Sequence, residues 1–155
     1  MTDSRQSICR RMKRNFQFFS FLNDQDIEVL SPFFHCRQAP AGSILWKEGD
    51  EEDYVAFIIS GRIEVRKATE FKEKQVVVGL YGKGSIVGEL CILNNVQRAV
   101  SAVVIEAADL LTLDREDLET IIRENPELGS KLLKGMLAAV SLRLRKSFDR
   151  LASIF

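Results

Sequence analysis

The sequence lacks the features by which membrane-spanning, secreted and metal-binding proteins are usually recognised. No run approaches the roughly 20 apolar residues that a helix needs to cross a bilayer. Four basic residues between positions 10 and 14 interrupt any apolar segment near the start. Only three cysteines occur, Cys9, Cys36 and Cys91, and they do not have the spacing of metal ligands. These absences predict a soluble cytoplasmic protein with reduced thiols.

Residues that enzymes commonly need are also scarce. His35 is the only histidine, so a histidine-dependent dyad elsewhere in the chain is excluded. The chain has no His-x-His cluster, no Gly-x-Ser-x-Gly turn of hydrolases and no Walker phosphate-binding loop. We therefore predict that the protein is not an enzyme and uses neither a metal nor another cofactor.

Acidic and basic side chains balance in number but are unevenly distributed. The formal net charge is zero, from 22 Lys and Arg against 22 Asp and Glu. Residues 1–15 carry five basic side chains, and six more lie between positions 131 and 150, whereas residues 48–53 form an acidic run. Basic ends are compatible with binding to nucleic acid or to an acidic membrane surface. We favour the simpler interpretation that they are the solvated faces of terminal helices.

Hydrophobic periodicity divides the chain into a helical start, a β-rich middle and a helical end. A chain of 155 residues suits one well-buried domain. We predict a single domain over residues 1–155, with a helical segment at 1–34, a β-roll at 35–114 and helices at 115–155. Short β-branched and aromatic runs punctuated by glycine predict the strands. The expected strands are 35–39, 43–47, 54–60, 62–68, 74–81, 101–107 and 109–113.

Local signals predict where individual elements begin and turn. Asn23 is expected to cap a helix in the first segment, and Asp114 to cap a helix over residues 115–124. Ser60-Gly61 lies between two alternating runs and predicts a tight hairpin. Asn125-Pro126 is expected to start a last helix that continues to about Ser153.

The last helix carries a wide apolar stripe. Its positions follow alternating steps of four and three residues, which is the pattern of a coiled-coil seam. The stripe could pack on the chain's own domain or against a second subunit, and the sequence leaves both open, with a homodimer as the expected oligomer. The stripe consists of Leu133, Leu137, Val140, Leu144, Leu151 and Ile154.

One segment, residues 84–101, combines the groups that would hold a phosphate beside sugar hydroxyls. Gly88 lets the backbone approach a ligand closely because it has no Cβ. The short apolar run that begins at Leu90 and Cys91 predicts a short helix, whose first N–H groups attract an anion. Arg98 supplies a planar fork of donors that matches phosphate oxygens. Glu89 is an acceptor suited to the sugar hydroxyls.

This segment resembles the phosphate-binding cassette of the cyclic nucleotide-binding domain family. The family pattern reads roughly Phe-Gly-Glu-Leu-Ala-Leu, a short variable loop, and then Pro-Arg-Ala-Ala-Thr-Val. The sequence Gly88-Glu-Leu and the pair Arg98-Ala99 match this pattern, and the spaced glycines upstream also recur. The resemblance covers roughly residues 16–148. Gln97 replaces the usual proline, and Ser101-Ala102 replaces the usual Thr-Val pair.

The resemblance implies a fold, a ligand and roles for individual residues. The implied fold is mainly β with flanking helices, a jelly-roll-like double-stranded β-helix with N-terminal helices and a long C-terminal helix. Arg98 would hold the phosphate, Glu89 the ribose 2′-hydroxyl, and Leu90 and Cys91 would offer backbone N–H groups. Members that favour cGMP commonly have threonine at the position of Ala99, so alanine favours cAMP.

The expected binding residues form three groups. Those of the cassette are Gly88, Glu89, Leu90, Cys91, Arg98, Ala99 and Val100. Candidates for an apolar wall against the base are Val78, Leu80 and Val87. Candidates for a lid on the last helix are Ser141, Arg143 and Arg145.

These residues predict a cyclic-nucleotide sensor that transmits cAMP binding through its last helix to an effector protein. The sequence stops at Phe155 without a helix-turn-helix, so direct binding to nucleic acid is not expected. One alternative is a module of the same fold with an empty pocket that serves protein interaction or dimerisation. A second alternative is a nucleic-acid binder that uses the basic ends.

Overall fold

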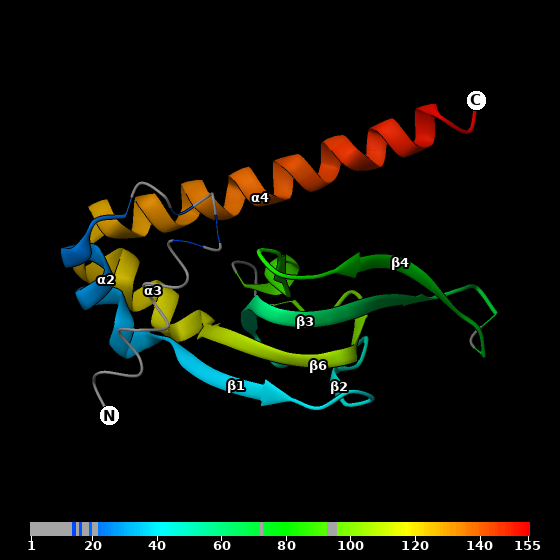
Figure 1. Ribbon diagram of the computed structural model, residues 1–155, viewed down its shortest axis with the longest axis horizontal. Coiled ribbons are helices and arrows are strands. Elements are labelled where there is room, and N and C mark those ends of the chain that lie inside the picture. The colour runs from blue at the N-terminus through cyan, green and yellow to red at the C-terminus, as the bar shows by residue number, and fades with distance from the viewer. Residues whose placement is uncertain (1–13, 15, 17–18, 20–21, 72, 93–95) are drawn as a thin grey trace.

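The computed structural model describes residues 14, 16, 19, 22–71, 73–92 and 96–155. In these residues helices flank a curved antiparallel sheet (Figure 1). The prediction of a mainly β fold with flanking helices is therefore confirmed. The elements are α2 (Asp24–Leu30), η2 (Ser31–Phe33), β1 (His35–Ala39), β2 (Ile44–Trp46), β3 (Tyr54–Ala68), β4 (Gln75–Tyr81), β5 (Ile86–Val87), η3 (Glu89–Cys91), β6 (Ser101–Asp114), α3 (Arg115–Glu124) and α4 (Pro126–Ala152).

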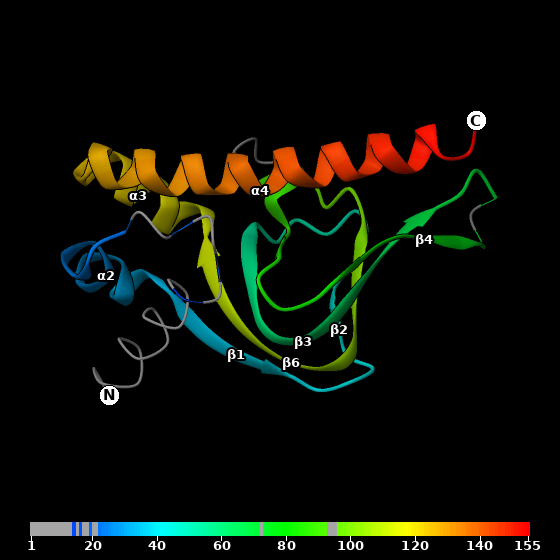
Figure 2. The ribbon, with the colours of Figure 1, turned by 45° about the horizontal axis from the view of Figure 1, so that its top comes forward.

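Two long strands, β3 and β6, form the centre of the sheet. They pair antiparallel from Tyr54 opposite Asp114 to Arg66 opposite Ser101. The order is β1-β6-β3-β4, with β2 also paired to β6 and β5 to β3. Figure 2 shows that both long strands bend, so that the sheet curls into a roll.

The predicted hairpin at Ser60-Gly61 is wrong, because β3 continues through these residues. Gly61 has a φ of +88°, and a Cβ there would come within 2.3 Å of the Ala107 carbonyl oxygen. The glycine therefore makes an irregularity where β3 is pressed against β6, rather than a reversal of the chain. The two strands expected on either side of Ala108 are likewise one continuous strand, β6.

The core has two parts, and the first fixes the helices to one end of the roll. Around Phe57, the ring centroids of Phe16, Phe19 and Phe34 lie 5.7, 5.5 and 5.6 Å away. This first part also contains the buried face of the C-terminal helices, namely Leu118, Ile121, Leu128, Leu132, Met136 and Ala139. The second part of the core fills the roll itself and includes Trp46.

The helix boundaries largely follow the predicted caps. Asn23 Oδ1 accepts a hydrogen bond from the Asp26 N–H at 2.8 Å, and the Asp26 side chain accepts one from the Asn23 N–H in return. Asn125 caps α4 by accepting from the Leu128 N–H at 3.2 Å. Asp114 occupies the N-cap position of α3, but its side chain makes no capping hydrogen bond, so that part of the prediction is wrong.

The long helix α4 lies along one side of the roll, with its first turns beside α3 (Figures 1 and 2). Its buried residues are on the face toward the core, whereas much of the predicted stripe is exposed. Leu137, Leu151 and Ile154 have 66%, 56% and 74% of their surfaces exposed. Packing on the chain's own core therefore leaves much of this stripe uncovered, although Val140 packs against the core. Within the described residues, no helix is long and apolar enough to span a membrane. The predicted helical stretch before residue 22 lies largely outside the described residues.

Candidate functional site

A cavity of about 270 Å³ lies between the segment 84–101, the inner face of the roll and α4. The roll contributes mainly apolar and aromatic side chains, and α4 contributes one face. The lining residues are Trp46, Val65, Val78, Tyr81, Val87, Gly88, Glu89, Leu90, Cys91, Arg98, Ala99, Val100, Val140, Arg143, Leu144 and Ser147.

Gly88 joins β5 to the short helix η3 and shapes the floor of this cavity. Its φ of +87° lies in the left-handed region, which side chains with a Cβ rarely adopt. A Cβ at this position would lie 2.7 Å from Arg98 Nη1, 2.8 Å from the Tyr54 carbonyl oxygen and 3.0 Å from the Trp46 ring. Glycine is therefore required both by the backbone conformation and by close packing.

Arg98 is almost completely buried, with 3% of its surface exposed. Its Nη2 donates to the Tyr54 carbonyl at 2.8 Å, and its Nη1 donates to the Gly88 carbonyl at 3.2 Å and to Cys91 Sγ at 3.0 Å. The guanidinium carbon lies 3.8 Å from the centroid of the Trp46 ring. These contacts fix the guanidinium plane at the wall of the cavity.

One nitrogen of the Arg98 guanidinium makes no hydrogen bond within the described part of the chain. Its Nε is buried and has no hydrogen-bond partner among the described residues. Burial lowers the pKa of the Arg98 guanidinium, because the charged form has lost water. An anion beside Nε would accept a hydrogen bond from it. The negative charge of the anion would also oppose the lowering of the pKa of the guanidinium by burial.

Glu89 and Arg143 connect the cassette to α4. The Arg143 Nη1 forms an ion pair with Glu89 Oε1, and its Nη2 donates to the Ile86 carbonyl. The guanidinium also lies over the Tyr81 ring, 4.2 Å from its centroid. Only 10% of the Glu89 side chain and 23% of the Arg143 side chain are exposed. Water therefore screens this pair less than it screens a surface ion pair.

Cys91 packs at the base of the same cavity. It is buried, and its Sγ is 3.4 Å from the Gly88 carbonyl oxygen in addition to its contact with Arg98. Burial raises the pKa of the Cys91 thiol, and the nearby Arg98 charge opposes that rise only in part. The thiol is therefore neutral near pH 7 and serves as a small packing residue.

The structure brings most of the predicted residues together. All seven predicted cassette residues line the cavity, as do Val78, Val87 and Arg143. Leu80, Ser141 and Arg145 are exposed and are not part of the described lining. On α4 the lining positions 140, 143, 144 and 147 follow helical spacing, so they share one face, and positions 141 and 145 point elsewhere.

Several lining residues were not predicted from the sequence. Trp46 stacks on Arg98 and donates its indole N–H to the Val100 carbonyl at 2.9 Å. Tyr81 lies under Arg143. The helical spacing of the C-terminal segment could have selected Val140, Leu144 and Ser147 together with Arg143. No comparable local pattern marks Trp46 or Tyr81, because their places depend on how the sheet curls.

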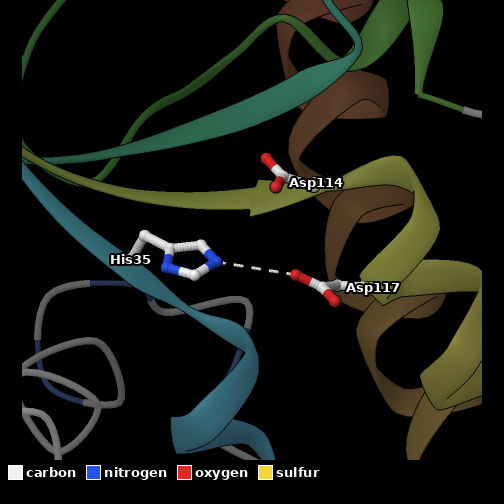
Figure 3. Close-up of side chains that lie close together, drawn as sticks. All are labelled: His35, Asp114 and Asp117. Carbon is white, nitrogen blue, oxygen red and sulfur yellow. Dashed lines mark ion pairs between the residues drawn. The ribbon is translucent and has the colours of Figure 1, made fainter.

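A separate cluster contains side chains that could hold a metal ion. His35, at the start of β1, lies beside Asp114 and Asp117 at the start of α3, with the possible ligand atoms within 4.8 Å of one another (Figure 3). His35 Nε2 is 3.6 Å from Asp117 Oδ2. Half of the His35 side chain is exposed, and Arg37 lines the adjacent hollow, where its positive charge disfavours a cation. We interpret the cluster as a surface contact between His35 and Asp117 that is distinct from the cavity.

Comparisons with known proteins point to one family. A model described as the cyclic nucleotide-binding domain matches residues 36–125, which is more than half of the chain. The chain is 28% identical over 129 residues to a "Cyclic AMP receptor protein" from Thermus thermophilus, covering 83% of this chain and 57% of the relative. It therefore spans little more than half the length of that relative.

Solved structures confirm the jelly-roll-like β-roll. A cyclic nucleotide-binding domain from Methylobacillus flagellatus superimposes with a TM-score of 0.85 and 25% identity, covering 95% of this chain and 85% of that one. The regulatory subunit of a cAMP-independent protein kinase A from Trypanosoma brucei has a TM-score of 0.71 at 22% identity, covering 86% of this chain and 47% of that one. At this low identity, the similarity to the kinase regulatory subunit shows only that the two proteins share a fold.

Proposed function

The chain belongs to the cyclic nucleotide-binding domain family, and we propose that it is a regulatory domain, not an enzyme, that binds cAMP in preference to cGMP. The observation that carries this proposal is the unpaired, buried Nε–H of Arg98 beside a cavity. Leaving a buried donor unsatisfied costs roughly 1–3 kcal/mol. A phosphate oxygen is an acceptor that such a donor, on a charged guanidinium, binds strongly.

The rest of the cavity suits the remainder of a nucleotide. Glu89 is the acceptor for the ribose 2′-hydroxyl, and the apolar wall formed by Val78 and Val87, with Leu144 from α4, receives the base. Ala99 has no hydroxyl group to accept a hydrogen bond from the amino group of guanine, which favours cAMP over cGMP. The Thermus relative is named as a cyclic AMP receptor, which supports the same preference.

In this proposal, α4 transmits the effect of ligand binding to a second copy of the chain or to an effector protein. Leu144 lines the cavity, yet 53% of its surface is exposed, and it belongs to the same stripe as Leu137 and Leu151. An apolar stripe of this length on an exposed helix face is suited to a second copy of the chain or to an effector protein. The homodimer is the form that we favour. The exposed free thiol of Cys36 fits a reducing, cytoplasmic location.

Calorimetric titration with cAMP and cGMP tests the ligand. We expect saturable binding of cAMP that is tighter than that of cGMP, and Arg98→Ala should weaken it by about 2–5 kcal/mol, because a desolvated phosphate loses its charged partner. Arg62→Ala is the matched control, since Arg62 lies on the outside of the roll in an exposed pair with Glu106. It should bind cAMP as the unmodified protein does.

The same titration, together with a DNA-binding assay at several salt concentrations, distinguishes the alternatives. Absence of heat from either nucleotide, with folded protein free of carried-over ligand, would favour an interaction module with an empty pocket. Binding to DNA that weakens steeply as salt increases, without nucleotide binding, would instead favour the basic ends as the functional surface. Either result would refute the proposal.

A further inference from the structure

The Arg98 guanidinium is buried without a charged partner among the residues that the structure describes. Its two terminal nitrogens donate to the carbonyl oxygens of Tyr54 and Gly88 and to Cys91 Sγ, and none of these acceptors carries a full charge. A buried charge is costly unless its surroundings compensate for the water that it has lost. Other neighbours of the guanidinium must therefore contribute to holding it in place.

Two aromatic rings lie against the guanidinium. Its central carbon is 3.8 Å from the centroid of the Trp46 ring and 4.8 Å from the centroid of the Tyr54 ring. The two rings are nearly perpendicular to each other, at 84°, with their centroids 5.4 Å apart. The face of an aromatic ring attracts a cation, and the attraction is strongest where water is excluded. Trp46 and Tyr54, called the aromatic pair below, therefore stabilise the positive charge without supplying a negative one.

The position of Trp46 is tied to the segment that carries Arg98. Trp46 is buried at the end of β2, and its indole N–H donates to the Val100 carbonyl at 2.9 Å. In the turn after β2, the Gly49 N–H donates to the Arg98 carbonyl, and the Arg98 N–H donates to the Asp50 carbonyl, both at 2.8 Å. The end of β2 and the turn after it therefore hold both the backbone and the side chain of Arg98.

We propose that the aromatic pair, and Trp46 above all, positions the Arg98 guanidinium for an anion while leaving its positive charge undiminished. A carboxylate in place of the rings would also fix the guanidinium, but its negative charge would repel a phosphate group. Without the stack, the side chain would populate further rotamers, and the apparent affinity would fall with the fraction that remains aligned. The inference rests on the proposed function for its phosphate ligand, whereas the stack itself does not.

Two substitutions of Trp46 separate stacking from packing in titrations with cAMP. Trp46→Phe keeps a ring over the guanidinium and should weaken binding by less than about threefold, whereas Trp46→Leu removes the ring and should weaken it about five- to thirtyfold. Phe34→Leu is the matched control, since Phe34 is also buried but lies in the first part of the core, outside the cavity lining. It should lower the free energy of unfolding in urea and leave the affinity for cAMP unchanged.

The fluorescence of Trp46 reports on the stack directly, because this residue is the only tryptophan of the chain. Arg98→Ala removes the cation from the face of the indole and should change the intensity or the maximum of its emission. Arg62→Ala should leave the emission unchanged, because Arg62 lies in an exposed pair with Glu106. This comparison is made on the protein alone, so it does not depend on which ligand binds.

The outcomes separate the stack from the proposed function. Unchanged emission in Arg98→Ala would overturn the stack, even in a protein that binds cAMP. Equal weakening of cAMP binding by Trp46→Phe and Trp46→Leu, or no weakening by either, would show that Trp46 serves packing alone. Failure of the unmodified protein to bind cAMP, with the emission still sensitive to Arg98, would instead overturn the proposed function and with it the alignment of Arg98 for that ligand.

Discussion

Substitution of Gly88 by alanine should destabilise the fold and disrupt the cavity together. The new Cβ would lie 2.7 Å from Arg98 Nη1 and 2.8 Å from the Tyr54 carbonyl oxygen, and the latter, being backbone, cannot rotate away. Overpacking of this kind costs about 1–3 kcal/mol. The left-handed φ of +87° costs about 1–2 kcal/mol more for a residue with a Cβ. We therefore expect Gly88→Ala to lower the free energy of unfolding by about 2–5 kcal/mol.

Gly42 provides a matched control for the backbone contribution. It has the same φ of +87°, but a Cβ there would meet no atom within 4 Å. Gly42→Ala should therefore lower the free energy of unfolding only through the strained backbone conformation. The loss should be about 1 kcal/mol, because the unfolded chain has less conformational entropy with alanine than with glycine, which offsets part of the strain. The difference between the two variants isolates the crowding around Arg98.

Urea and thermal unfolding of the two variants measure this difference. A loss of 1 kcal/mol lowers the Tm of a chain of this length by about 2–4 °C. Gly88→Ala should have the lower Tm, and it should also bind cAMP more weakly, because Arg98 must move. Equal loss of stability in the two variants would refute the claim that the floor of the cavity is packed too closely for a Cβ.

Two further predictions concern pH and assembly. Burial raises the pKa of the Cys91 thiol and of the Tyr54 phenol above the ordinary values of 9.0 and 10.0. Each therefore contributes stability that is full below its ordinary value and is lost as the pH rises through the raised folded-state value. Urea unfolding should show stability falling above pH 9, and Cys91→Ala should make the fall shallower; an identical fall in the variant would contradict this assignment. On α4, Leu151→Glu should shift a homodimer to monomer in analytical ultracentrifugation, because it places a charge in the apolar stripe, and an unchanged sedimentation coefficient of a dimeric protein would place the seam elsewhere.

The cassette could be predicted from the sequence because its determinants are local. Gly88, Glu89 and Arg98 lie within eleven consecutive residues, and each has a chemistry that its residue type nearly fixes. The strands were also largely predictable from their short apolar runs. Gly61 was misread because the same residue serves a hairpin or a bulge, and only the partner strand β6 decides between them.

The residues that close the cavity could not be predicted with the same precision. Tyr81 reaches Arg143 only because the roll curls β4 toward α4, a contact between residues 62 positions apart in sequence. Among the three polar lid candidates, helical spacing alone could have preferred Arg143, because it shares a face with Val140 and Ser147. Its pairing with Glu89 depends on where the helix crosses the cassette, which no local pattern specifies.

Leu144 connects the cavity to the exposed stripe of α4. It lines the cavity, yet about half of its surface is exposed, and the adjacent Arg143 pairs with Glu89 of the cassette. We expect a ligand that displaces Leu144 to move Leu151, two turns further along the same helix, as well. Under the proposed function, the nucleotide would then alter the exposed stripe without contacting a partner itself.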